Sequence, residues 1–159
     1  MSYNLAQINI GRFRLPVEHP ANADFVANLD RINALADSQP GFIWRLKGEG
    51  NNATDIKPYD DPNMAINMSV WRDMDALAGF VYRTAHREIM RRRREWFEEM
   101  DVYLALWWVP VGHTPTIEEG KAKVGLLARL GPTPEAFTFK QPFTAPDATP
   151  IAPVLDECA

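Results

Sequence analysis

The segment that most constrains the fold spans residues 70–100, because its apolar spacing indicates a long helix that is followed at once by an aromatic strand. Asp73 is well placed to cap the helix, which we predict over residues 74–97. The strand is predicted over residues 103–109. The apolar residues that set the helical spacing are Leu77, Val81, Ala85, Ile89 and Trp96. A helix between two strands limits the number of folds that the chain can adopt.

The remaining elements follow from alternation, helical spacing and turn residues. A capping box, Thr116 with Glu119, opens a helix that Gly131 ends. The other predicted elements are strands at 5–13, 42–47, 64–71 and 137–143, a helix at 21–37 and a turn-rich loop at 48–62.

The order of these elements is β-α-β-β-α-β, so we expect a ferredoxin-like α+β fold with an added C-terminal helix and an extended, proline-rich tail. The expected boundaries are a domain over residues 1–143 and a tail over residues 144–159. Two helices cover only one face of such a sheet. We therefore expect a second copy to cover the other face, giving a dimeric α+β barrel with a cavity between the sheets.

Composition excludes several classes of function. The net charge of −4 argues against a nucleic-acid partner, and no apolar run is long enough to span a membrane. The amino-terminal sequence lacks the order of a signal peptide, so a cytoplasmic protein is expected. With Cys158 as the lone cysteine and no metal-ligand spacing of histidines, we expect neither a disulfide framework nor a metal site.

His86 is the leading candidate for chemistry, since it lies in the middle of the predicted long helix at the edge of its apolar stripe. Tyr82, Arg93 and Phe97 share that side of the helix. His86 could serve as a general acid or base, as a ligand to heme iron, or as a partly buried histidine with a structural hydrogen bond.

The run of four arginines at residues 91–94 turns through all sides of a helix, so the four side chains cannot share one role. Glutamates four residues away favour a solvated, salt-bridged face. Arg93, on the side of His86, could instead pair with a substrate carboxylate or a heme propionate.

Strand parity selects candidate substrate contacts. Asn67, Ser69 and Trp71 share one face of their strand, as expected for an apolar pocket that orients a ligand with few polar groups. Trp107 and Trp108 point to opposite faces, and we assign Trp107 to the cavity. A half-solvated face explains the polar pattern equally well. The candidate substrate contacts are Asn67, Ser69, Trp71, Trp107, Phe97 and the loop residue His113.

Several separate segments between residues 5 and 143 carry a resemblance to a known family, among them PGFIWRL, YLALWWVPVGHTPT and LGPTPEAFTF. They resemble a largely uncharacterised domain-of-unknown-function family of the dimeric α+β barrel superfamily, distantly similar to spheroidene-monooxygenase-like proteins. The resemblance implies a homodimer. It also implies a superfamily that includes cofactor-free monooxygenases, heme proteins, dehydratases and isomerases.

We therefore expect a small-molecule enzyme that acts on a hydrophobic substrate in a cavity under the sheet. Its chemistry would be monooxygenase-like or acid/base, as in an isomerase, cyclase or dehydratase. His86, Tyr82 and Arg93 would be its catalytic residues. The alternatives are a non-catalytic dimer that binds heme or a hydrophobic ligand, and a dimer with a solid core.

Overall fold

The computed structural model describes residues 2–50 and 52–147 and contains a four-stranded antiparallel sheet with strand order β2-β3-β1-β4. The strands are β1 (Tyr3–Arg12), β2 (Phe42–Arg45), β3 (Met64–Trp71) and β4 (Leu104–Pro110). The helices are η1 (Pro20–Asn22), α1 (Ala23–Asp37), α2 (Met74–Arg83), α3 (His86–Arg91), α4 (Arg93–Trp96) and α5 (Ile117–Leu130). This arrangement confirms the predicted ferredoxin-like α+β fold with an added helix. No helix among the described residues is long and apolar enough to cross a membrane.

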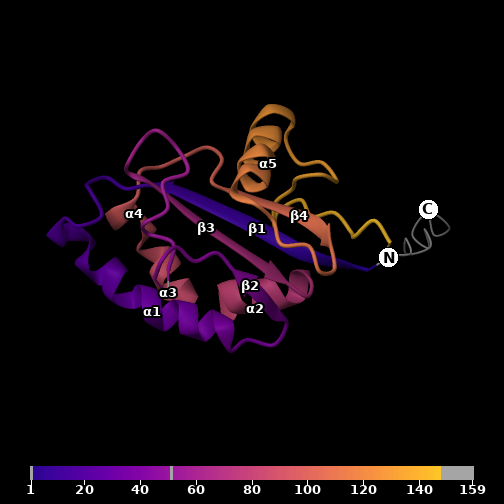
Figure 1. The fold of residues 1–159 in the computed structure, drawn as a ribbon, viewed down its shortest axis with the longest axis horizontal. Helices are drawn as coiled ribbons and strands as arrows, with labels where there is room; N and C mark the ends of the chain where they lie inside the picture. The colour runs from indigo at the N-terminus through magenta and orange to yellow at the C-terminus, as the bar shows by residue number, and fades with distance from the viewer. Residues whose placement is uncertain (1, 51, 148–159) are drawn as a thin grey trace, which may run out of the picture.

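The sheet is covered on both sides by its own chain (Figure 1). Helices α1, α2 and α3 lie on one side of it and α5 on the other. Strand parity assigns each side chain to one face, and the register places Gln7 of β1 opposite Ser69 of β3. We call the face that carries Gln7 and Ser69 the cavity face, and the other the α5 face.

The α5 face was expected to need a second copy of the chain to cover it, and the structure corrects this expectation. Ile8, Met68 and Trp107 on this face are buried within the single chain, where they pack with Val124 and Leu127 of α5. Partly buried side chains of the predicted loop at 48–62, such as Ile56 and Tyr59, pack against the same cluster. A second copy is therefore not required to cover this face.

The predicted long helix over residues 74–97 is replaced by α2, α3 and α4. The break lies at Thr84, whose backbone is extended and whose hydroxyl donates to the carbonyl oxygen of Phe80 at 2.6 Å. The same hydroxyl oxygen accepts from the backbone N–H of His86 at 3.2 Å, which starts α3. A threonine side chain that bonds nearby backbone groups in this way competes with helix continuation.

The C-terminal part differs from the sequence-based expectation in one element. The helix capped by Thr116 and ended by Gly131 is confirmed, with Gly131 at φ 71°. The predicted strand over 137–143 is reduced to one antiparallel bridge, between Phe137 and Leu106. Pro142 has no N–H to extend a ladder, and a turn closes where Gln141 donates to the Thr138 hydroxyl. Residues 148–159 of the predicted tail, including Cys158, lie outside the described residues.

Candidate active site between the sheet and the helices

A cavity of about 260 Å³ lies between the cavity face of the sheet and the helical layer. Helix α1 contributes Leu29 and Ile32 to its wall, and α2 contributes Leu77 and Phe80. Of the sequence-predicted site residues, the cavity brings together Asn67, Ser69, Trp71, Tyr82, His86, Arg93 and Phe97. The cavity thus lies inside one chain rather than between two sheets.

Polar side chains on the strands form a connected cluster in the cavity. Gln7 donates both N–H groups of its side-chain amide, one to Asn67 Oδ1 at 2.7 Å and one to Ser69 Oγ at 2.8 Å. Trp71 also donates its indole N–H to Ser69 Oγ at 2.8 Å. Because its oxygen accepts from Gln7, the Asn67 amide has its own N–H groups left to donate to a ligand.

Gln7 and Asn9 are cavity residues that the sequence analysis did not select. Both lie on β1, and the register sets them opposite Ser69 and Asn67 respectively. The available signal was the shared parity of the amide side chains of Gln7 and Asn9 on this strand. It becomes informative only once the pairing of β1 with β3 is known.

His86 begins α3 and lines the cavity beside Phe80, with the two ring centroids 4.8 Å apart. Its Nδ1 is buried and has no hydrogen-bond partner among the described residues. Burial lowers the pKa of His86 below 6.5, while a hydrogen bond with the Val81 backbone acts in the opposite direction. A buried polar atom without a partner costs about 1–3 kcal/mol, so its presence calls for a functional explanation.

Arg93 places a cation at the cavity wall. Its guanidinium carbon lies 4.1 Å from the centroid of the Tyr103 ring, a cation–π contact. Within the described part of the chain it makes no ion pair with a carboxylate. Arg93 is therefore the arginine of the run that is available to an anionic group in the cavity.

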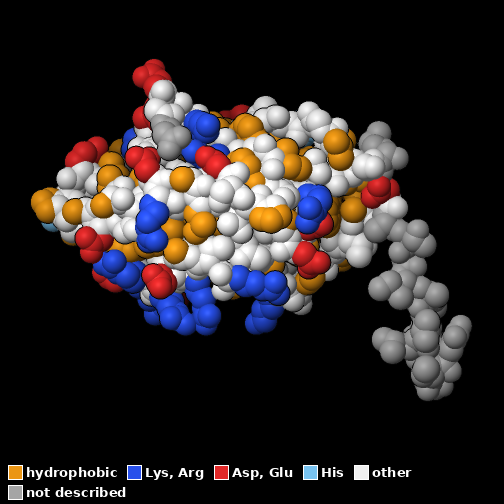
Figure 2. All heavy atoms as spheres, turned by 90° about the horizontal axis from the view of Figure 1, so that it is seen from below, with side chains coloured by type: hydrophobic (Ala, Val, Ile, Leu, Met, Phe, Trp, Pro, Cys, Tyr) orange, Lys and Arg blue, Asp and Glu red, His pale blue; other side chains and the backbone are white. Residues whose placement is uncertain are grey.

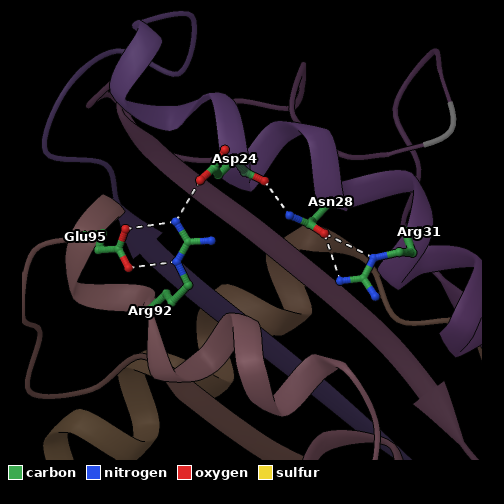
Figure 3. Close-up of polar contacts among 5 residues, drawn as sticks. All are labelled: Asp24, Asn28, Arg31, Arg92 and Glu95. Carbon is green, nitrogen blue, oxygen red and sulfur yellow. Dashed lines mark hydrogen bonds and ion pairs between the residues drawn. The ribbon is translucent and has the colours of Figure 1, made fainter.

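Arg92 and Arg94 form ion pairs at the surface, as expected for a solvated face. Arg92 forms a two-bond ion pair with Glu95 and donates to Asp24 of α1 at 2.9 Å (Figure 3). Arg92 thus pairs with Glu95 at a spacing of three residues rather than with Glu88. Viewed from the helical side, Lys and Arg side chains gather along one margin of the molecule (Figure 2).

Phe97 closes one end of the cavity by stacking on Phe13, with the ring centroids 4.5 Å apart. The stack depends on Gly11 of β1, because a Cβ at this position would lie 2.6 Å from Phe97 Cδ1. A strand glycine at such a site marks the close approach of another group.

Two predicted substrate contacts lie elsewhere. Trp107 is on the α5 face, where its indole N–H donates to Glu119 Oε2 at 2.8 Å, so its assignment to the cavity is corrected. The assignment failed because parity alone does not say which face holds a cavity. His113 contacts Glu119 Oε1 at 2.7 Å on the same side of the sheet. Burial acts to raise the pKa of Glu119, but hydrogen bonds from His113 and Trp107 outweigh it and lower that pKa.

The residues of the cavity do not fit a heme as they are arranged. The cavity volume of about 260 Å³ is below the range of about 300–1,000 Å³ that is usual for drug-sized ligands, and a tetrapyrrole macrocycle is larger than these. The described residues also hold no group of three or more acidic, cysteine or histidine side chains suited to a metal ion.

Comparison with known families shows to which family the chain belongs. Residues 4–152 match the family described as a domain of unknown function, DUF3291, and the chain belongs to that family. No curated protein matches the sequence. The sequence resemblance to a domain-of-unknown-function family is therefore confirmed.

Solved structures with a distant likeness to the chain include structures of two proteins. One is SnoaB, a cofactor-independent oxygenase from Streptomyces nogalater, with 17% identity, a TM-score of 0.45 and coverage of 71% of this chain and 97% of its own. The other is NE2512, a protein of unknown function from Nitrosomonas europaea, with 13% identity, a TM-score of 0.45 and coverage of 72% and 94%. Likeness at this distance does not transfer an activity, so the function must be derived from the residues of the cavity.

Proposed function

We propose that this protein is a small-molecule enzyme that binds a compact, largely apolar substrate in the cavity and uses His86 as its general base. The observation that carries the proposal is the buried Nδ1 of His86, which has no hydrogen-bond partner among the described residues and lies in a cavity wall. Perturbed titratable groups in cavities are enriched at functional sites.

The protonation state of His86 suits a base at neutral pH. Burial lowers its pKa below 6.5, so the imidazole is neutral near pH 7 and an unprotonated ring nitrogen can accept a proton. The N–H or O–H of a substrate would satisfy the Nδ1 lone pair in the bound state. The resulting imidazolium would be costly in this buried position, which favours return of the proton to the substrate over its retention on His86.

The rest of the cavity supports a substrate that develops negative charge. Removal of a proton by His86 leaves an anion, and Arg93 is a cation at the same cavity wall without a carboxylate partner in the described chain. Asn67 offers amide N–H donors from the sheet side. The wall between them is apolar and aromatic, with Phe80, Trp71 and Phe97. An enolisable or phenolic ring compound meets these requirements.

A proton-exchange assay tests the proposal without knowledge of the natural substrate. β-Tetralone, an apolar bicyclic ketone with an acidic C–H, is incubated with the protein in heavy water, and deuterium incorporation is followed by NMR. We expect His86→Gln to slow the protein-dependent exchange by about 10²–10⁴-fold, the usual contribution of a positioned base. The matched control is His113→Gln, which alters a histidine on the α5 side of the sheet and should leave exchange unchanged.

The assay separates the two functional classes. Binding of the ketone with exchange that His86→Gln does not slow contradicts the assignment of a base and favours a non-catalytic binding protein. Binding can be followed by quenching of Trp71 and Trp96 fluorescence, since both side chains line the cavity. Equal exchange in the presence and absence of the protein, with no quenching, contradicts both the enzyme and the binding site.

A further inference from the structure

We infer that the site extends beyond the cavity into a second subsite, a groove on the protein surface that holds the apolar arm of an elongated substrate. This inference rests on the proposed function, because it assumes that the head of the substrate occupies the cavity. The groove has a volume of about 760 Å³. Its wall comes from α2, from the start of β4 and from the segment that follows α5.

The groove exists because the chain leaves the edge of β4. Phe137 and Leu106 exchange two backbone hydrogen bonds, of 2.8 and 2.9 Å, as a fifth strand would. The ladder does not continue among the described residues, and Thr138, Phe139 and Lys140 line the groove instead of pairing with the strand. The start of β4 is thereby left open on this edge.

The two spaces share a wall. Four residues line both the groove and the cavity: Tyr82, Tyr103, Leu104 and Phe139. Tyr82 and Phe139 meet edge to face, with their ring centroids 5.5 Å apart. Tyr82 is 48% exposed, so one side of this partition faces solvent. Aromatic rings that turn about their side-chain bonds can separate the two spaces or join them.

The residues around this shared wall indicate which class of substrate could extend from the cavity into the groove. Arg93 stacks on Tyr103 from the cavity side, so the cation lies where a head group in the cavity would join its arm. The groove beyond is mainly apolar, with Met74, Ala78 and Leu127 in its wall. The substrate class is therefore a ring compound with a polar head and an apolar arm too long for a cavity of about 260 Å³.

A series of para-alkylphenols, from ethyl to octyl, tests the subsite. The hydroxyl can donate to His86 Nδ1, while the alkyl arm grows by one methylene at a time. If the arm enters the groove, the Kd should fall by about fourfold for each methylene buried, and the fall should continue past the length that fills the cavity. Ala78→Trp should block the groove, because Ala78 lines the groove but not the cavity.

We expect Ala78→Trp to leave the Kd of the ethyl compound unchanged and to abolish the gain in affinity that each further methylene gives in the longer compounds. The matched control is Ala122→Trp on an exposed position of α5, which should behave as the unmodified protein. Identical series for the unmodified protein and Ala78→Trp would overturn the subsite while leaving the cavity intact. Absence of binding by every phenol would overturn the proposed function as well.

Discussion

Arg92 donates to the carboxylate of Asp24 at 2.9 Å, joining the end of α3 to the first turn of α1, two helices that both contribute residues to the cavity wall. Glu95 holds the same guanidinium through two further hydrogen bonds, of 2.8 and 3.0 Å. The hydrogen bonds to Glu95 and Asp24 raise the pKa of Arg92. The ion pair is exposed to solvent, so it should hold α3 against α1 without adding much to global stability.

Asp24→Asn should loosen α3 and α4 more than the rest of the fold. The amide cannot form an ion pair, so local opening of this wall should become more frequent. Native-state hydrogen exchange should show faster exchange in α3 and α4 and little change in the central strands. Glu18→Gln, at an exposed carboxylate that forms no ion pair among the described residues, is the comparison variant. Equal acceleration in every element would mean that the pair supports the whole fold instead.

Stability should depend on pH through His86. Since burial lowers the folded-state pKa of His86 below 6.5, the unfolded chain takes up a proton first as pH falls. The contribution of neutral His86 to the free energy of unfolding should therefore be complete above pH 6.5 and should decrease as the pH falls below it. His86→Phe, which removes the titrating ring, should reduce this dependence. Urea denaturation at about pH 7.5 and about pH 5.5 measures both slopes, and equal slopes for the two proteins would contradict the lowered pKa.

Gly11→Ala should destabilise the end of the cavity. The added Cβ would lie 2.6 Å from Phe97 Cδ1, and overpacking of this kind costs about 1–3 kcal/mol. Phe97→Leu in the same chain should recover part of the loss. Gly79→Ala is the contrasting variant, because its Cβ meets open space in α2 and should stabilise by up to about 1 kcal/mol. Chemical denaturation measures the free energy of unfolding of both variants. Equal changes for Gly11→Ala and Gly79→Ala would contradict the packing of Phe97 on β1.

Trp107→Phe should change stability without changing ligand binding. The variant loses the indole hydrogen bond to Glu119, which costs about 1–3 kcal/mol because the acceptor is a carboxylate. Trp71→Phe, on the cavity face, should alter both properties, since Trp71 lines the cavity and donates to Ser69. The Kd for para-ethylphenol, read beside the unfolding free energy, distinguishes the two tryptophans. A higher Kd for Trp107→Phe would show that Trp107 contributes to ligand binding after all.

The homodimer implied by the family resemblance remains a proposal, and the structure restricts its form. The α5 face of the sheet is buried within one chain, so a dimer would have to use other surfaces. Light scattering after size-exclusion chromatography should show a dimer at micromolar concentration. A monomer at that concentration would contradict the implied assembly but would leave the intrachain cavity unaffected.

The sequence predicts the fold well where local signals and tertiary packing agree. The alternation over residues 64–71 matches β3, and the Thr116 cap with Gly131 bounds α5. It fails at Thr84, because a side chain that bonds the Phe80 carbonyl breaks the helix without changing its apolar spacing. His86 was selected from its place on that helix, yet the break determines how its ring meets the cavity. Gln7 was missed because its role depends on register with Ser69, a relationship between distant strands.

The most direct test of the central claim is an NMR titration of the His86 ring nitrogens in protein with ¹⁵N-labelled histidine, with and without para-ethylphenol. We expect an apparent pKa below 6.5 and a neutral ring near pH 7, with a shift of the Nδ1 resonance when the phenol hydroxyl donates to it. A His86 that titrates at or above 6.5, with nitrogen resonances that the phenol leaves unchanged, would contradict the assignment of His86 as the base of this site.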